Sequence, residues 1–361
     1  MIPLISTTEM PNSLKREFTH AVRKTLDRDS LIDGEECRGF EKKFGEYLGG
    51  LHCVGVGNGY DALYALIIAL SLPSRSRIGV PVHTFAATWL SIINAGHIPI
   101  GIDIDKFGNL NSELLHNYAN ENLSAVVVVH MHGNPAQIQD ILEWCKRQSI
   151  LLIEDCAQAA GLKISGRHAG TFGVASIFSF YPTKNLFALG DGGAVVTSDP
   201  SLASQVRQIT RYGSNQIDRN LRKLPAVNSR LDSIQAAILS VGLKHLDEWN
   251  YERRRIASIY TELLGESFET NGELREKSVY HHFTLQVESR NRFIELMKQR
   301  QVVIGIHYPN LAFDGIYPEK RDFPSASQYT KKTVSLPISP WQDLRTTKRV
   351  AREILSVLNC L

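Results

Sequence analysis

The stretch "FSFYPTKNLFALGDGGAVV", residues 178–196, places a single lysine, Lys184, between an apolar-aromatic run and a glycine cluster. An amine at the end of a strand can be a loop lysine whose charge stays in water. It can also be a reagent, because a neutral lysine forms Schiff bases with carbonyl compounds and transfers protons. The partners that the fold brings to Lys184 decide between these two roles.

A carboxylate is the first such partner. The segment "LLIEDCAQAAG" ends an apolar, buried-looking run with Asp155, and Gln158 follows three residues later. Ligands of parallel sheets bind at the carboxyl ends of the strands. A carboxylate buried at such an end needs a cation or several hydrogen bonds. Asp155 is therefore a candidate ligand-binding acid, and a solvent-facing loop acid is the alternative.

Glycines 55, 57 and 59 in "VGVGNGYDAL" stand between an expected strand and an expected helix. Glycine there lets backbone N–H groups approach an anion, which the helix N-terminus also attracts. The pattern is not a dinucleotide fingerprint, because Tyr60 occupies its last glycine position and no acid follows at the required distance. The segment favours a monophosphate site, and a tight turn without any ligand is the alternative.

Together these features meet the needs of pyridoxal phosphate. That cofactor requires a cradle for its phosphate, an acid beside its ring nitrogen and an amine for its aldehyde. Asp155 would hold the ring in its electron-withdrawing state. Burial would lower the pKa of Lys184 and allow its neutral amine to carry protons.

The elements that must position these residues alternate between strand and helix. Helices are expected at 11–30, 35–49, 60–72, 86–96, 137–148 and 201–213, and strands at 51–56, 77–82, 98–104, 124–133, 150–157, 175–181 and 192–198. This alternation predicts an α/β fold with a mostly parallel sheet covered on both faces. Residues 230–264 read as one long helix or two in series. We expect strands at 278–288 and 302–309 in a smaller α+β domain, with boundaries at 1–248 and 249–361.

Composition narrows the class of protein. The chain has 361 residues, which favours two domains, and a net charge of +3, too mild for a nucleic-acid or membrane-binding face. No apolar run approaches the length of a membrane span, and the N-terminus does not resemble a signal peptide. The five cysteines are odd in number and form no C-x-x-C pair, so neither a disulfide framework nor structural zinc is expected, and a reducing cytoplasm fits best.

Two histidine pairs have side chains of a type that could bind a metal ion. His130 and His132 have a spacing that suits ligation on one strand face, but no third ligand is evident. His281 and His282 are adjacent, and adjacent side chains on a strand point to opposite faces. We therefore expect no metal site.

The chain resembles the sugar aminotransferases of the DegT/DnrJ/EryC1/StrS family over most of its length. The motifs that carry the resemblance are "GVGNGYDAL", "PVHTFAATWLSIINAGHIPIGIDID", "LLIEDCAQAAG", "FSFYPTKNLFALGDGGAVVTSD", "NSRLDSIQAAIL", "IHYP" and "SLPISP". It implies the PLP-dependent transferase fold of type I, as in aspartate aminotransferase. "GNGYDAL" and "SFYPTKNLFALGDGGA" are most similar to enzymes that aminate C3 of dTDP-3-keto-6-deoxyhexoses.

The resemblance also implies residue roles. Lys184 would attach to the cofactor aldehyde, Asp155 would pair with the ring nitrogen and Gln158 would lie near the ring hydroxyl. The remaining cofactor-binding residues would be Gly59, Tyr60, Asp61 and Ser179 at the phosphate, Phe85 on the ring face and Asn228, reaching the phosphate of a neighbouring subunit in a homodimer. Substrate contacts would be Tyr181, His307 and Tyr308 at the sugar, and Arg222 and Lys223 at the nucleotide phosphates.

The function implied is transfer of an amino group from L-glutamate to C3 of a dTDP-linked keto sugar. Amination of C4 of a nucleotide-linked 4-keto sugar is the alternative, and a PLP-binding regulator without turnover is an alternative of another class. A dehydrogenase is disfavoured by the glycine pattern. Two departures from the family, Ala226 and Phe187, stand where glycine is common, and Phe187 could either narrow the site or pack outward.

Overall fold

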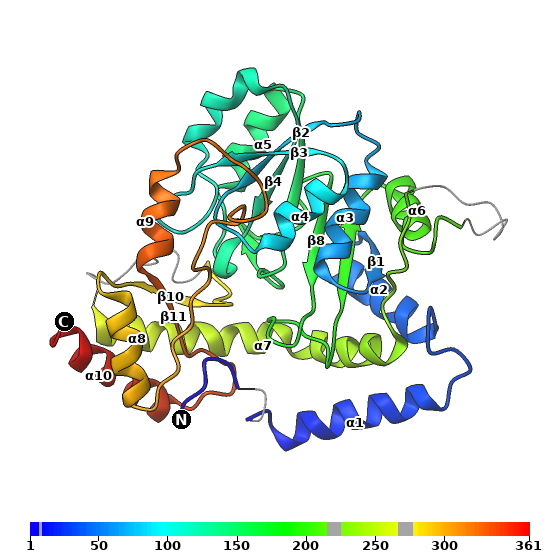
Figure 1. Cartoon of the computed structure of the whole chain (residues 1–361). Helices are drawn as coiled ribbons and strands as arrows, with labels where there is room; N and C mark the ends of the chain where they lie inside the picture. The colour runs from blue at the N-terminus through cyan, green and yellow to red at the C-terminus, as the bar shows by residue number, and fades with distance from the viewer. Residues whose placement is uncertain (7–8, 215–224, 266–276) are drawn as a thin grey trace.

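The computed structural model describes residues 1–6, 9–214, 225–265 and 277–361. Its centre is a seven-stranded sheet in the order β1-β9-β8-β5-β4-β2-β3 (Figure 1). The strands are β1 (His52–Val56), β2 (Arg77–Pro81), β3 (Ile98–Ile102), β4 (Leu123–Val129), β5 (Leu151–Asp155), β8 (Ala175–Ser179) and β9 (Gly193–Thr197). β9 is antiparallel to both of its neighbours, and the pairs from β8 to β3 are parallel. The expected mostly parallel α/β sheet is confirmed.

The sheet is buried on both faces, as the unbroken apolar run of β4 indicates. Ala125 and Val127 lie in a cluster with α3 (Gly59–Ala69), α4 (Ala86–Asn94) and α6 (Pro200–Ile209). Val126 and Val128 lie in a second cluster with α5 (Ile138–Arg147). Successive side chains of a strand point to opposite faces, so valine at every position fits a strand between two helical layers.

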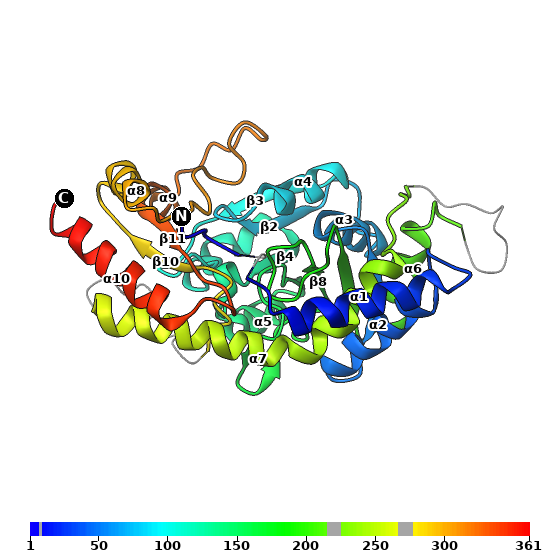
Figure 2. The same ribbon diagram turned by 90° about the horizontal axis from the view of Figure 1, so that it is seen from below.

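The base of the molecule is formed by α1 (Asn12–Leu26), α2 (Glu35–Tyr47) and α7 (Ser233–Leu264). α7 is one continuous helix of 32 residues, which settles the question left open by the sequence. Figures 1 and 2 show it running along the base with α1 beside it. The expected boundary between residues 248 and 249 falls inside α7, and the division into domains stays a prediction.

The C-terminal part contains a two-stranded antiparallel sheet of β10 (Phe283–Gln286) and β11 (Thr333–Leu336). Its helices are α8 (Arg290–Gln299), α9 (Pro324–Lys332) and α10 (Leu344–Leu358).

Two strand predictions in this part need correction. The prediction of a strand at 302–309 is wrong, because only isolated bridges form at Val302 and Gly305. The strand expected at 278–288 is confined to β10, and residues 278–282 form a loop in which Tyr280 has a φ of 43°. Short elements complete the fold: η1 (Glu113–Glu121), η2 (Met131–Gly133), β6 (Lys163–Ile164) and β7 (Arg167–His168).

No helix within the described ranges is both long enough and apolar enough to cross a bilayer. The five cysteines, all of which are described, form no disulfide, as the sequence predicted.

Phe187 packs away from the cavity that holds Lys184. Its ring stacks on Trp249 at 5.4 Å between centroids and meets Phe18 and Trp341 edge-on. The side chain is 4% exposed and joins α1 to α7 in one apolar cluster. Phe187 therefore packs outward and does not narrow the site.

Replacing Phe187 by alanine should cost stability without changing substrate selection. A buried phenylalanine truncated to alanine loses about 3–5 kcal/mol of unfolding free energy. Denaturant unfolding of the variant should show this loss, whereas KM for each substrate should stay near that of the parent protein. Leu189→Ala, at a side chain that is 54% exposed, is the matched control and should unfold almost normally. A changed substrate preference in Phe187→Ala would contradict a purely structural role.

Candidate active site

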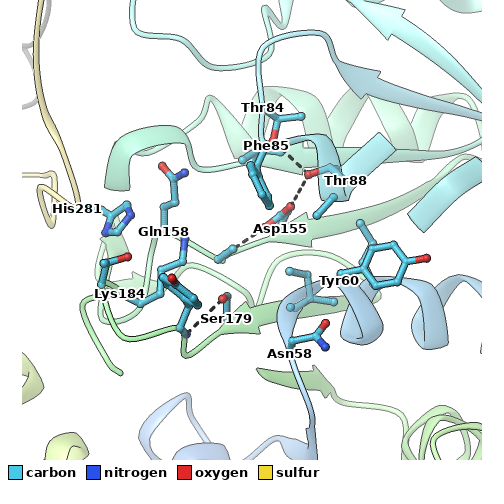
Figure 3. A pocket seen from close by; sticks show the side chains of 18 of the residues that line it. Asn58, Tyr60, Thr84, Phe85, Thr88, Asp155, Gln158, Ser179, Lys184 and His281 are labelled. Carbon is cyan, nitrogen blue, oxygen red and sulfur yellow. Dashed lines mark hydrogen bonds between the residues drawn. The ribbon is translucent and has the colours of Figure 1, made fainter. Parts of the chain in front are cut away.

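A cavity of about 640 Å³ opens at the carboxyl edge of the sheet. Its walls come from the end of β5, the loop after β8, the N-termini of α3 and α4, and two loops of the C-terminal part. Figure 3 shows Lys184, Asp155, Gln158 and His281 gathered around this space, with Ser179 and Asn58 at its lower edge. Parallel strands end together here, which is why residues far apart in the sequence meet.

Lys184 lies in the turn after β8, where its N–H donates to the carbonyl of Tyr181 at 2.8 Å. Burial lowers the pKa of its amine to about 8, and the nearby Asp155 carboxylate opposes part of this effect. No described residue hydrogen-bonds to Nζ. An amine with these properties is available in its neutral, nucleophilic form near neutral pH.

Asp155 ends β5 and is 5% exposed. Its Oδ2 accepts a hydrogen bond from Thr88 at 3.0 Å, and its Oδ1 accepts one from the Ala157 N–H at 3.0 Å. Thr84 lies 3.1 Å from Thr88 and completes this chain. Burial raises the pKa of the Asp155 carboxyl, while these hydrogen bonds and Lys184 oppose the rise. A carboxylate held by neutral donors in a dry site has lone pairs left for a cationic partner, such as a protonated ring nitrogen.

The N-terminus of α3 forms an anion-binding corner with the end of β8. Gly59, Tyr60 and Ser179 line the cavity there. A Cβ on Gly59 would lie 2.9 Å from the Cβ of Ser179, so only glycine permits this approach. The first N–H groups of a helix have no partner within the helix, and Gly59 and Tyr60 present theirs at this corner.

Asp61 differs from its predicted role at the phosphate. Its N–H donates to Oδ1 of Asn58 at 2.8 Å, and its carboxylate accepts from Asn58 and from Ser229 at 2.7 Å. Asp61 does not line the cavity, and its amide is used by the helix cap. It is placed to hold the turn that shapes the corner rather than to bind an anion directly.

Gln158 and the aromatic side chains shape the middle of the cavity. Oε1 of Gln158 accepts from the His132 N–H at 2.6 Å, and Nε2 donates to the Tyr308 hydroxyl at 3.1 Å. Phe85 is 57% exposed and lies 5.5 Å from the Tyr308 ring. An aromatic ring exposed inside a cavity is well placed to stack on a flat ligand.

The predicted substrate residues fall into two groups. Tyr181, His307 and Tyr308 line the cavity, and Tyr181 is 52% exposed. Arg222 and Lys223 lie outside the described residues. Asn228 is exposed and does not line the cavity of its own chain.

Several lining residues escaped the sequence prediction. His281 and His282 both line the cavity, although they were expected on opposite faces of a strand. The expectation failed because they lie in a loop, where strand alternation does not apply. Asn58 carried a usable signal, since asparagine before a helix is a common N-cap. Thr88, inside α4, carried none.

His130, Glu154 and Cys156 form a buried group with ligand atoms within 4.8 Å of one another. Hydrogen bonds already occupy two of its members. Glu154 accepts from His130 at 3.2 Å and from the N–H groups of Gly170, Phe172 and Gly173. Nδ1 of His130 accepts from the Ala136 N–H, so its Nε2 carries the proton that Glu154 binds. The group is a hydrogen-bonded structural cluster.

The chemical groups that line the cavity are those that pyridoxal phosphate requires. The buried Asp155 has capacity left for a ring nitrogen, the free N–H groups of α3 with Ser179 suit a phosphate, and the buried amine of Lys184 suits an aldehyde. The fold and site thus define a pyridoxal phosphate-dependent aminotransferase of fold type I.

Comparison with known proteins agrees with this class. The model of the DegT/DnrJ/EryC1/StrS aminotransferase family matches residues 12–355. The erythromycin biosynthesis sensory transduction protein EryC1 of Saccharopolyspora erythraea is 35% identical over 348 residues, 94% of each chain. The dTDP-3-amino-3,6-dideoxy-alpha-D-galactopyranose transaminase of Aneurinibacillus thermoaerophilus is 35% identical over 367 residues, 98% of this chain and 99% of that protein.

Among solved structures, S. venezuelae DesV in complex with a ketimine intermediate superposes with a TM-score of 0.93. It is 32% identical, and the match covers 99% of this chain and 98% of that one. The chain belongs to the DegT/DnrJ/EryC1/StrS aminotransferase family.

Proposed function

We propose that the protein transfers the amino group of L-glutamate to C3 of a dTDP-linked 3-keto-6-deoxyhexose, giving a dTDP-3-amino-3,6-dideoxyhexose. The main support for amino-group transfer is that a buried amine, Lys184, and a buried acid, Asp155, line the same cavity. The choice of C3 and of dTDP is supported by the similarity to the A. thermoaerophilus enzyme, whose name gives such a product.

Each residue has a defined task in this proposal. Pyridoxal phosphate supplies the electron sink that stabilises a carbanion on the substrate. Asp155 stabilises the positive charge on the ring nitrogen, and Ser179 holds the phosphate with the N–H groups of Gly59 and Tyr60. Lys184, with a pKa of about 8, removes and returns the proton at the reacting carbon.

A homodimer with shared active sites is part of the proposal. Asn228 is exposed and outside its own cavity, which suits a role at the cofactor phosphate of a second copy. Arg222 and Lys223 would bind the nucleotide phosphates, because guanidinium and ammonium groups suit a pyrophosphate.

Product identification tests the substrate assignment. The purified protein, loaded with pyridoxal phosphate and glutamate, would be incubated with 3-keto and 4-keto sugars linked to dTDP or UDP. We expect an amine at C3 of the dTDP sugar, located by NMR. An amine at C4 would establish the alternative regiochemistry. Absence of transfer from glutamate to every sugar of the panel would favour a binding protein without turnover.

A further inference from the structure

Three histidines form a continuous wall on one side of the cavity. The rings of His282 and His307 stack in parallel, with 3.8 Å between centroids and 13° between planes. Nδ1 of His282 lies 3.2 Å from Nδ1 of His132. His132 and His282 are 0% and 4% exposed, while His282 and His307 line the cavity. We call His132, His282 and His307 the histidine wall.

One nitrogen of each stacked ring is already engaged by the protein. Nδ1 of His307 lies 2.9 Å from the hydroxyl of Ser335 in β11, and Nδ1 of His282 is paired with His132. No group in the described parts of the chain hydrogen-bonds to Nε2 of His282 or His307. The two rings therefore have one nitrogen each left for a ligand, and both nitrogens of an imidazole become donors when the ring is protonated.

The surroundings of the wall keep it neutral in the free protein. Burial lowers the pKa of His307 to about 4, and Lys184 contributes in the same direction. Burial also lowers the pKa of His282 and of His132. The titratable groups that face the wall are His83, His281 and Lys184, together with the tyrosines that pack against His307 and His132, which are Tyr308 and Tyr329. Asp155 and Asp191 line the same cavity, but neither hydrogen-bonds to a wall residue within the described ranges.

We propose that the histidine wall binds a carboxylate of the amino donor and takes up a proton from solvent when it does so. This inference rests on the proposed transfer from an amino acid. Two stacked rings that each keep one nitrogen without a protein partner can each donate to one oxygen of a carboxylate. A buried carboxylate needs such donors, and an anion beside an imidazole favours the protonated ring.

The wall is assigned to the carboxylate of the amino donor because the other ligand groups in the cavity already have partners. The free N–H groups of α3 and Ser179 are engaged by the cofactor phosphate, and Lys184 by the cofactor aldehyde. A 6-deoxyhexose ring carries no anionic group. The nucleotide phosphates are assigned to Arg222 and Lys223 in the proposed function. The donor carboxylate is thus the anion left to the wall.

Proton uptake gives the binding a definite pH dependence. The pKa of His307 is about 4 in the free protein, and a carboxylate bound beside it raises that pKa in the complex. Affinity is then greatest at low pH and falls as pH rises towards the pKa in the complex, by up to about tenfold per pH unit for one proton.

Glutarate, a dicarboxylate without an amine, is the probe, because it binds to the holoenzyme without undergoing transfer. Calorimetric titrations in two buffers of different ionisation enthalpy count the protons taken up, and visible absorbance counts separately those bound at the cofactor. We expect net uptake at the protein and, above the carboxyl pKa values of glutarate at about 4–5, affinity that falls as pH rises. His282→Phe keeps a stacked ring without nitrogens, and should bind glutarate at least about tenfold more weakly, with less proton uptake.

His116→Phe, at an exposed position in η1, is the matched control and should bind like the parent. A second variant, His282→Gln with His307→Gln, keeps hydrogen-bonding groups that do not titrate at both positions, and should lose the pH dependence even if some affinity remains. Normal cofactor absorbance verifies folding of each variant.

The glutarate experiment can fail or succeed independently of the test of the proposed function. Glutarate binding that takes up no proton at the protein, or equal binding by His282→Phe and the parent, would overturn the histidine wall even in an enzyme that uses glutamate. Failure of glutamate to convert the cofactor at all would overturn the proposed function instead, whatever glutarate does.

Discussion

Replacing Lys184 by alanine is expected to lower the rate of aminotransfer by up to about 10⁴-fold and to change the visible absorbance of the cofactor bound to the enzyme. The buried amine, with a pKa of about 8, both anchors the aldehyde and moves the proton in the proposed reaction. Proton transfer by one positioned side chain contributes about 10²–10⁴-fold to a rate. The loss should reach the upper part of this range, measured as the turnover of glutamate and keto sugar.

Lys163→Ala is the matched control, because Lys163 is exposed in β6 and does not line the cavity. It should turn over at the normal rate. The apoprotein of Lys184→Ala should melt near the parent temperature, because burial already disfavours the charged amine. A turnover rate unchanged in Lys184→Ala would remove the lysine from the chemistry, whereas an unchanged cofactor-bound absorbance would remove it from the anchoring role.

The sequence was informative where a local pattern has one structural meaning. The alternation of strands and helices predicted a parallel sheet covered on both faces, and the two apolar clusters on either side of β4 confirm this. Asp155 and the lysine stretch could be assigned to one edge because parallel strands end together. Ser179 was assigned to the phosphate by the family resemblance, and it lies at the end of β8 beside the N-terminus of α3.

The sequence was misleading where a nearby group competes for a hydrogen bond. The amide of Asp61 looked free for a phosphate, but the Asn58 side chain accepts its hydrogen bond.

The strand prediction for residues 302–309 failed for a different reason. These residues are rich in β-branched and apolar side chains, yet His307 and Tyr308 line the cavity and the segment pairs only at isolated positions. Tertiary packing overrides β-propensity in such a segment.

The histidine wall could not have been predicted from spacing. Its members come from η2, the loop before β10 and the loop that follows α8. The last two loops meet because β11 pairs with β10 and also forms a bridge from Ser335 to Gly305. Read locally, His281 and His282 suggested strand alternation. Their neighbour Tyr280 has a positive φ, which turns the chain and places both rings on the cavity.

Replacing Asp155 by asparagine is expected to lower turnover by about 10²–10³-fold, the usual effect of removing one preorganised electrostatic group from a reacting centre. Asparagine has nearly the same shape, and its oxygen can still accept from the Ala157 N–H. Its amide, however, cannot neutralise a protonated ring nitrogen. Since Asp155 raises the pKa of Lys184, the variant should also lower the pKa of the amine below about 8.

Asp155→Asn should lower the turnover rate without lowering the free energy of unfolding. Burial raises the pKa of Asp155, so the ionised carboxylate opposes folding as pH rises above the pKa of an aspartate in the unfolded chain. Asp155→Asn lacks this cost, and its apoprotein should be at least as stable as the parent at neutral pH in denaturant unfolding. Asp322→Asn, at an exposed position, should change neither property. If Asp155→Asn kept full activity, the acid would not serve the cofactor nitrogen. If it lost activity and stability together, the loss would reflect damage to the fold.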